Sequence, residues 1–112
     1  MIEYEALENM IVITGASKDE VDLVIPSIID DKQVCLIKEN AFSGNNNIIS
    51  VKIPGSVKVI GEYAFSSCNK LKKVDLDEGV ETIEDWAFIS SPIETIDLPR
   101  SIRNIGTNAF LG

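Results

Sequence analysis

Residues 71–88 read LKKVDLDEGVETIEDWAF and hold the complete form of a unit that recurs along the chain. The apolar positions of the unit are Leu71, Val74, Leu76, Val80, Ile83, Ala87 and Phe88. Val74 and Leu76 are two residues apart, so their side chains lie on one face of an extended strand, whereas Lys73 and Asp75 point to the other face. The segment therefore predicts a short strand with one buried face.

The unit repeats with a nearly constant period. The dipeptide Ala-Phe occurs at residues 41–42, 64–65, 87–88 and 109–110, so the steps are 23, 23 and 22 residues. Three of the four prolines directly follow an isoleucine or leucine and end the preceding strand, because proline cannot donate to a ladder. A period near 23 is too short for a pair of helices but fits a solenoid with one short strand per turn.

The rest of each turn must close the coil. We expect residues 57–60 and their equivalents to form a second extended stretch on the opposite wall. Residues 62–65 are expected to form a short helical turn that carries the phenylalanine into the core. The predicted fold is a β-dominated α/β solenoid with one short parallel strand per turn, in which the four phenylalanines form one continuous buried column: Phe42, Phe65, Phe88 and Phe110.

The first 25 residues break the period and predict an N-terminal cap. Apolar and acidic residues alternate over residues 2–5, a polar turn follows near Glu8-Asn9, and residues 10–15 read MIVITG. This pattern favours a β-hairpin that covers the core of the first turn, as a solenoid requires at its ends. We therefore expect a single domain over residues 1–112, with a cap at 1–25 and about four turns in 26–112.

The first and last turns differ from those between them. The first ladder strand is expected at residues 21–26, with a five-residue insertion before Val34. No cap follows Phe110, so the strand near Ile96 is predicted to have an unpaired edge and an open apolar cross-section. Two explanations remain at this point: the chain is a fragment of a longer array, or the edge pairs with another chain.

Composition excludes several classes of protein. Hydrophobic residues make up 45% of the chain and charged residues 25%, which is typical of a globular domain. The longest unbroken apolar run has four residues, too few for a membrane span or a signal peptide, so no membrane insertion is expected. The formal charge of -8 repels phosphates, so no nucleic-acid partner is expected.

The sequence offers little catalytic or redox chemistry. It contains no histidine, which removes the commonest general base and the commonest zinc ligand. Cys35 and Cys68 are too few for a disulfide framework and are predicted to be free thiols, at least one of them buried. We expect no enzymatic activity, no cofactor and no bound metal.

Residues 53–71 read IPGSVKVIGEYAFSSCNKL. This run resembles the BspA-like leucine-rich repeat in its period, in its Ile-Pro, Ile-Gly and Ala-Phe steps, and in the cysteine three residues after phenylalanine. The resemblance extends over about residues 21–110. Two departures stand out: Ser56, Gly79 and Ser101 replace the asparagine that follows the strand in ordinary leucine-rich repeats, and Asn45 and Ser91 stand in place of Cys68.

The resemblance implies a solenoid that binds other molecules by surface contact. Members of the family are often adhesins of bacterial or protist cell surfaces. A cell-surface or secreted location is thus implied for this chain, although its own residues leave the compartment unknown. Fold-level similarity indicates no particular ligand.

The outward residues of the predicted strands supply the candidate binding site, because leucine-rich solenoids generally bind through this sheet. One column contains Ser50, Lys73 and Thr95, and the next contains Val24, Lys52, Asp75 and Asp97. The face lacks the large aromatic residues that dominate many interfaces. A solvated polar face without a ligand is therefore the alternative explanation.

Tyr63 and Trp86 are secondary binding candidates. Each stands directly before an Ala-Phe dipeptide, where Asn40 and Asn108 occupy the same place in other turns. Paired aromatic rings in neighbouring turns could anchor a ligand. The alternative is half-buried packing beside the predicted helical turns.

Charge is distributed unevenly along the repeat. Residues 40–73 carry five lysines and one acid, a net charge of +4, whereas residues 74–97 carry eight acids and no base. Stacking of the turns places Lys52 beside Asp75, which is favourable, and Asp75 beside Asp97, which is repulsive. A calcium site in the acidic turn is an alternative role, but no EF-hand or Asp-rich nonapeptide loop is present.

These observations favour a non-catalytic binding module that recognises a protein or a glycan through the outward face of the strand ladder. The alternative hypothesis is a structural or assembly unit of a longer array, which forms a homo-oligomer through its open C-terminal edge. An enzyme is not expected, because the open surface of a solenoid provides no cleft for a substrate.

Overall fold

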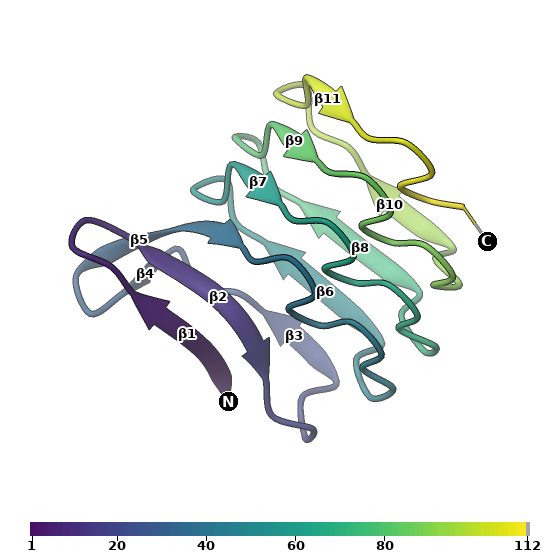
Figure 1. Cartoon of the computed structure of the whole chain (residues 1–112), viewed down its shortest axis with the longest axis horizontal. Helices are drawn as coiled ribbons and strands as arrows, with labels where there is room; N and C mark the ends of the chain where they lie inside the picture. The colour runs from purple at the N-terminus through teal and green to yellow at the C-terminus, as the bar shows by residue number, and fades with distance from the viewer. Residues whose placement is uncertain (112) are drawn as a thin grey trace.

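The chain forms a stack of coils in a computed structural model that describes residues 1–111 (Figure 1). The strands are β1 (Ile2–Ala6), β2 (Ile11–Ala16), β3 (Asp22–Val24), β4 (Ile28–Ile29), β5 (Lys32–Ile37), β6 (Ser50–Ile53), β7 (Val59–Ile60), β8 (Lys73–Leu76), β9 (Thr82–Ile83), β10 (Thr95–Asp97) and β11 (Asn104–Ile105). The predicted strand-dominated solenoid of about four turns is confirmed. Over residues 1–111, no helix has the length and apolarity needed to cross a membrane.

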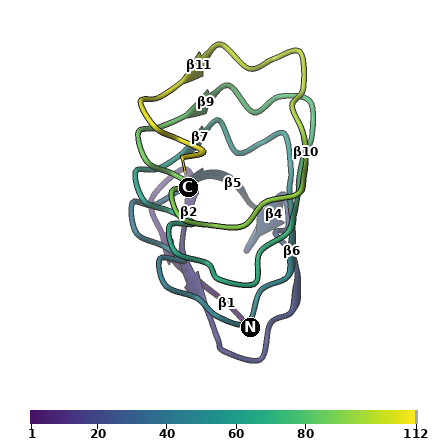
Figure 2. The same ribbon diagram turned by 90° about the vertical axis from the view of Figure 1, so that its right-hand side faces the viewer.

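Two walls of strands enclose the core, and Figure 2 separates them. One wall is a four-stranded parallel sheet in the order β10-β8-β6-β3. The other is a seven-stranded sheet in the order β1-β2-β5-β7-β9-β11, with β4 paired to β5. The second extended stretch predicted in each turn is therefore real, although only two residues long in β7, β9 and β11.

Equivalent residues of successive turns stack in register. Val51 pairs with Val74, and Val74 pairs with Ile96 on the far side. On the opposite wall Ile60 lies between Ile37 and Ile83. Because the strands alternate their side chains between two faces, this register places every second residue in one continuous core.

The phenylalanine column is confirmed. Neighbouring rings from Phe42 to Phe110 are stacked, with centroids 4.9, 5.1 and 5.2 Å apart. Phe65 and Phe88 are fully buried, whereas Phe110, the last ring, is 37% exposed. Phe110 is the last ring of the column within residues 1–111.

The expectation of short helical turns was wrong, since residues 1–111 contain no helix. In the segment before Phe65, the Ala64 N–H donates to the Gly61 carbonyl at 3.1 Å, but Tyr63 has a φ of 58°. Ser67 follows with a φ of 52°. A left-handed residue cannot continue a right-handed helix, so each segment is instead a succession of tight turns.

These turns are also bound to one another across the coils. The Phe42, Phe65 and Phe88 N–H groups each donate to the carbonyl of the alanine one turn further along, each at 2.7 Å. Backbone hydrogen bonds between coils therefore continue outside the strands. They satisfy donors that would otherwise be buried without a partner.

Ser101, at the asparagine position, and Ser91, at the position of Cys68, both hydrogen-bond the backbone of the preceding turn. Ser101 Oγ donates to the Val80 carbonyl at 2.7 Å and accepts from the Gly79 N–H at 2.8 Å. Ser91 Oγ likewise donates to the Phe65 carbonyl and accepts from the Cys68 N–H. A hydroxyl both donates and accepts, so one serine satisfies two backbone groups of the preceding turn.

Close contact between turns requires glycine at the corner after β6. A Cβ atom on Gly55 would lie 1.9 Å from the Glu78 carbonyl oxygen. Gly79 is in the next turn, directly against Gly55, and has a φ of 120° that only glycine adopts readily. Lys58 Nζ links the same two turns by donating to the carbonyls of Gly55 and Gly79.

The N-terminal hairpin is confirmed as β1 and β2, which pair antiparallel. Strand β2 then pairs parallel with β5, so that Ile11 and Ile13 are fully buried and close the core at this end. The predicted insertion forms the small hairpin of β4 and β5. A hydrogen bond links the cap to this insertion: Tyr4 OH donates to the Asp30 carboxylate at 2.9 Å.

Candidate functional site: the outward face of the four-stranded sheet

The two predicted columns of outward residues exist on the wall of β3, β6, β8 and β10. One column runs through Asp22, Ser50, Lys73 and Thr95, and the other through Val24, Lys52, Asp75 and Asp97. Their outward direction follows from the register, because the residues between them are buried core.

Four of the six predicted binding residues line one shallow groove of about 170 Å³. Its lining is Asp22, Leu23, Val24, Ser50, Val51, Lys52, Lys73 and Asp75. Thr95 and Asp97 lie on β10, outside the groove, at the C-terminal edge of the same sheet. The structure thus brings Ser50, Lys52, Lys73 and Asp75 together and leaves the other two apart.

Sequence reasoning missed Asp22 as a member of the site. Its carboxylate accepts a hydrogen bond of 2.7 Å from Ser50 Oγ, which fixes both side chains at the rim. The alternation of side chains along a strand could have identified it. Val24 is predicted to lie beside Lys52, and Asp22 is two residues earlier, so it lies on the same face. Val24 itself is 63% exposed and forms an apolar spot between the charges.

The lysines of the face are not neutralised by ion pairs. Lys52 lies opposite Asp75 in register, as predicted, yet the ion pairs found within residues 1–111 do not include Lys52 or Lys73. The inter-turn pair is Lys72 with Glu94 at 3.8 Å, and both side chains are largely exposed. Exposed pairs of this kind contribute little to stability. The two ammonium groups of the face are therefore available to a ligand.

The secondary candidates Tyr63 and Trp86 lie on a different part of the molecule, in the turns after β7 and β9. Their rings stack with centroids 5.4 Å apart and an angle of 15° between planes. Tyr63 is 38% exposed and Trp86 is half-buried. Both have a φ of 58°, the left-handed conformation that Asn40 and Asn108 share at the equivalent positions.

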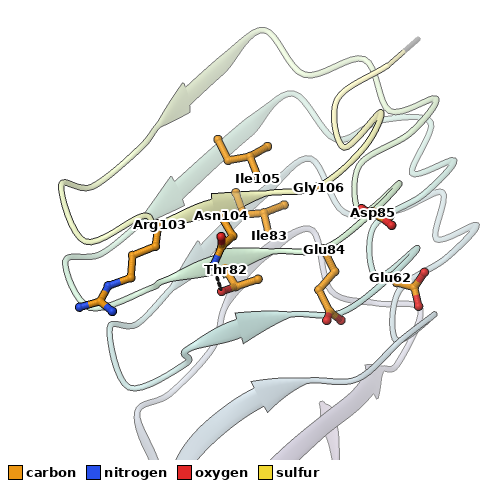
Figure 3. Close-up of a pocket in the computed structure, with 9 residues that line it drawn as sticks. All are labelled: Glu62, Thr82, Ile83, Glu84, Asp85, Arg103, Asn104, Ile105 and Gly106. Atoms are coloured by element: carbon orange, nitrogen blue, oxygen red, sulfur yellow. Dashed lines mark hydrogen bonds between the residues drawn. The ribbon is translucent and has the colours of Figure 1, made fainter.

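A larger groove, of about 590 Å³, runs along the edge of β9 and β11 (Figure 3). Three carboxylates and one guanidinium line it: Glu62, Glu84, Asp85 and Arg103. Asp85 already accepts a hydrogen bond of 2.7 Å from the Thr107 N–H, and Figure 3 shows Arg103 directed away from Glu62 and Asp85. Sequence reasoning missed this groove, whose lining includes Gly106, where a Cβ atom would lie only 2.3 Å from Asp85 Oδ1 of the adjacent turn.

Metal-binding geometry is not found in the described part of the chain. Residues 1–111 contain no group of three or more histidine, cysteine or carboxylate side chains arranged to hold an ion. The acids of residues 74–97 are distributed over both walls, from β8 through β9 to β10 of the adjacent turn. Calcium requires six to eight oxygens around one point, which this arrangement does not provide.

Both cysteines are free thiols, as predicted. Cys68 is buried and its Sγ donates to the Phe42 carbonyl at 3.1 Å. Burial raises the pKa of Cys68 to about 11, so the thiol stays protonated and unreactive at neutral pH. Cys35 is partly exposed on β5.

Comparison with protein families decides the classification. The profile described as "BspA type Leucine rich repeat region (6 copies)" matches residues 24–112. The chain belongs to the BspA-type leucine-rich repeat family. Members of this repeat family are generally non-catalytic scaffolds. A search of curated proteins found no match.

Solved structures of bacterial leucine-rich repeat proteins share the fold. A T. pallidum leucine-rich repeat protein, TpLRR, is 32% identical with a TM-score of 0.90, over 97% of this chain and 52% of its own. A protein from Bacteroides ovatus is 28% identical with a TM-score of 0.84, over 99% of this chain and 31% of its own. A third, from Bacteroides capillosus, is 24% identical with a TM-score of 0.68, over 96% of this chain and 94% of its own, and supports the fold alone.

This BspA-type chain spans about half the length of the T. pallidum protein and about a third of the Bacteroides ovatus protein. Activities and partners of the longer proteins therefore remain proposals for it. Membership of the family supports directly only that the chain is a repeat scaffold with an extended surface.

Proposed function

We propose that this chain is a binding module that recognises a protein or a glycan through the outward face of β3, β6, β8 and β10. The groove over β3, β6 and β8 carries the proposal, because it gathers charged, polar and apolar groups on one rigid wall. Sites on strands hold their side chains more precisely than sites on loops. Adhesion at a cell surface is the biological setting that the family resemblance suggests.

The charges of the groove define the chemistry of a suitable ligand. Lys52 and Lys73 lie without ion-pair partners, and Asp22 and Asp75 stand beside them. A ligand surface with carboxylates or sulfates opposite the lysines and with N–H donors opposite the aspartates would complement this pattern. Val24 supplies an apolar contact between them.

The test is a double substitution, Lys52→Glu with Lys73→Glu, assayed on arrays of immobilised matrix proteins and of glycans. Wild-type chain is expected to be retained by at least one array member, and the variant is expected to lose that retention at least about tenfold, since each reversed charge repels the ligand. Retention should also decrease with added salt, because exposed charges are screened.

The matched control is Lys38→Glu with Lys70→Glu, which makes the same change of net charge at exposed positions away from the groove. This control is expected to bind like the wild type. Equal loss in both variants would show a general charge effect and contradict the proposed face. No binding by the wild type to either array would contradict the proposed function.

Tyr63 and Trp86 are proposed as packing residues rather than as a second binding site. Their rings face each other, so each covers one face of the other. A Trp86→Asn variant that keeps full retention on the arrays would agree with this role, because Asn108 occupies the same position in the next turn.

A further inference from the structure

Peptide groups around each phenylalanine form hydrogen-bonded columns along the stack. The Phe42 N–H donates to the Ala64 carbonyl at 2.7 Å, and the Gly44 N–H donates to the Ser66 carbonyl at 2.8 Å. The equivalent donors of the next two turns make the same bonds, at 2.7 and 2.8 Å. A trans peptide group holds its C=O opposite its N–H, so the carbonyls of both columns point toward the N-terminal cap.

Both columns stop at the first turn, where they end in the Ala41 and Ser43 carbonyls. Every equivalent carbonyl of the later turns accepts an N–H from the turn before it. Within residues 1–111, the carbonyls of Ala41 and Ser43 accept no hydrogen bond from the backbone or from a side chain. The cap comes close without pairing, since a Cβ atom on Gly15 would lie 3.1 Å from the Ala41 carbonyl oxygen. Two strong acceptors are therefore left for another molecule.

A hollow of about 340 Å³ lies at these carbonyls, between the loop that follows β2 and the loop that follows β5. Ala16 and Lys18 line it from the cap, and residues 41–47 line it from the first turn. Figure 1 shows both loops on the same side of the stack. Ala16, Ala41 and Phe42 supply the apolar part of the lining. Its volume is within the range of small-molecule sites.

The polar part of the lining combines donors, acceptors and one positive charge. The side-chain amides of Asn46 and Asn47 make no hydrogen bond within residues 1–111, whereas Asn45 Oδ1 already accepts the Asn47 and Ile48 N–H groups. Lys18 is exposed, and the ion pairs found within the same residues do not include it. The two amides and the ammonium group are thus available beside the two carbonyls.

This combination disfavours three kinds of occupant. The lining contributed by residues 1–111 holds no carboxylate, so a calcium ion would lack its usual ligands. An inorganic anion would meet the negative ends of two carbonyl dipoles. An extended peptide offers carbonyls as well as N–H groups, but the N–H groups of Phe42 and Gly44 point to the next turn and leave those carbonyls without donors.

We propose that the hollow binds a sugar residue that carries a carboxylate, of the uronic acid class. A hydroxyl both donates and accepts, so ring hydroxyls donate to the Ala41 and Ser43 carbonyls and accept from the amides of Asn46 and Asn47. The sugar carboxylate pairs with the Lys18 ammonium group. This site goes beyond the proposed function and does not rest on it, because the groove over β3, β6 and β8 shares no lining residue with the hollow.

The experiment is a titration of the 15N-labelled 112-residue chain with methyl β-D-glucuronide, followed by heteronuclear NMR in physiological salt. The amide signals of Phe42 and Gly44 should shift, because each amide shares a peptide group with a carbonyl that gains a hydrogen bond. The signals of Phe65 and Ser67, one turn further along, should shift less. Binding is expected to saturate with a Kd of roughly millimolar order. Methyl β-D-glucoside should bind at least about threefold more weakly, because it lacks the carboxylate that pairs with Lys18.

A double variant tests the side chains of the site. Lys18→Ala with Asn46→Ala should weaken glucuronide binding at least about tenfold, because it removes the charge and one amide from the lining. Both residues are exposed, so the fold should persist, as checked by unchanged amide signals in the later turns. The matched control is Asn69→Ala with Lys70→Ala, which removes the same residue types at exposed positions one turn further along. It should bind the glucuronide like the wild type, since the columns are complete there.

Three outcomes would overturn the proposal. The first is the absence of saturable shifts at Phe42 and Gly44 with up to about 100 mM glucuronide. The second is equal weakening by the double variant and its control, which would indicate a general effect of charge. The third is glucoside binding as tight as glucuronide binding, which would remove the carboxylate from the ligand class. Lys52→Glu with Lys73→Glu should bind the glucuronide like the wild type, so this site and the outward face of the strands are tested separately.

Discussion

At the scale of the residue, one position in each turn adopts a backbone conformation that few side chains tolerate. Asn40, Tyr63, Trp86 and Asn108 all have φ values between 53° and 61°. Asparagine enters this region readily, whereas a bulky residue there costs free energy. The stacked rings of Tyr63 and Trp86 offset part of that cost by their mutual contact.

A pair of substitutions separates the backbone cost from the ring contact. Tyr63→Ala and Tyr63→Asn both remove the ring, but only asparagine suits the left-handed backbone. Tyr63→Asn should therefore be the more stable of the two by about 1 kcal/mol. Urea denaturation measures the difference, and equal stability of the two variants would show that the backbone conformation costs nothing.

Cys68 makes the folding stability of the chain depend on pH in the alkaline range. Its pKa is raised to about 11 by burial, while an unfolded chain loses the same proton near pH 9. The folded state binds more protons between these values, so this contribution is present in full below pH 9 and is lost as pH rises to 11. The loss should approach about 2 kcal/mol.

The measurement compares wild type with Cys68→Ser at each pH, because lysine and tyrosine titrations then cancel. Serine fits the site, since Ser91 occupies it in the next turn and bonds the Phe65 carbonyl. Above pH 9 the free energy of unfolding of the wild type should fall relative to that of Cys68→Ser. A difference that stays constant from pH 8 to pH 11 would contradict the raised pKa of Cys68.

At the scale of the element, the phenylalanine column joins the turns. Phe88 is fully buried between Phe65 and Phe110, with ring centroids 5.1 and 5.2 Å away. Phe88→Ala should lower the free energy of unfolding by roughly 3–5 kcal/mol, because it leaves a cavity. Phe110→Ala should cost less, about 1 kcal/mol in this chain, since its ring is 37% exposed.

Chemical denaturation provides this comparison. Phe42→Ala is the matched control at the capped end, where the ring is buried and a loss close to that of Phe88→Ala is expected. A loss for Phe110→Ala as large as that for Phe88→Ala would contradict the partial exposure of the Phe110 ring.

At the scale of the whole molecule, like charges accumulate on the later turns. The chain carries a formal charge of -8, and residues 74–97 contain eight acids without a base. Asp75 lies beside Asp97 in register, and both are outward. Added sodium chloride should therefore raise the free energy of unfolding by about 1 kcal/mol between low salt and half-molar salt.

Urea titrations at two salt concentrations test this dependence. Asp75→Asn with Asp97→Asn should be more stable than wild type at low salt and should respond less to added salt, because the adjacent carboxylates are gone. Asp22→Asn with Asp31→Asn removes two exposed carboxylates from the earlier turns and should leave the salt response larger than in the first variant.

Much of this architecture could be predicted from the position of each residue within the repeat. Stacked turns of equal length leave little choice of register, so the spacing of Lys52 and Asp75 was enough to place them side by side. The same regularity predicted the burial of Phe65 and Phe88, and its interruption over residues 1–25 predicted the hairpin cap. The helical turns were wrong because Tyr63 has a left-handed φ of 58° and the Phe65 N–H donates to the Ala87 carbonyl of the next coil instead of continuing a helix.

The sequence by itself determined the solenoid, its period and the residues of each wall, because side-chain alternation and repeat spacing are local and add up over four turns. Only the tertiary structure decided which outward residues share a groove and that Ser91 and Ser101 satisfy the backbone of the turn before them. Those features depend on distances between coils, which the order of residues does not specify.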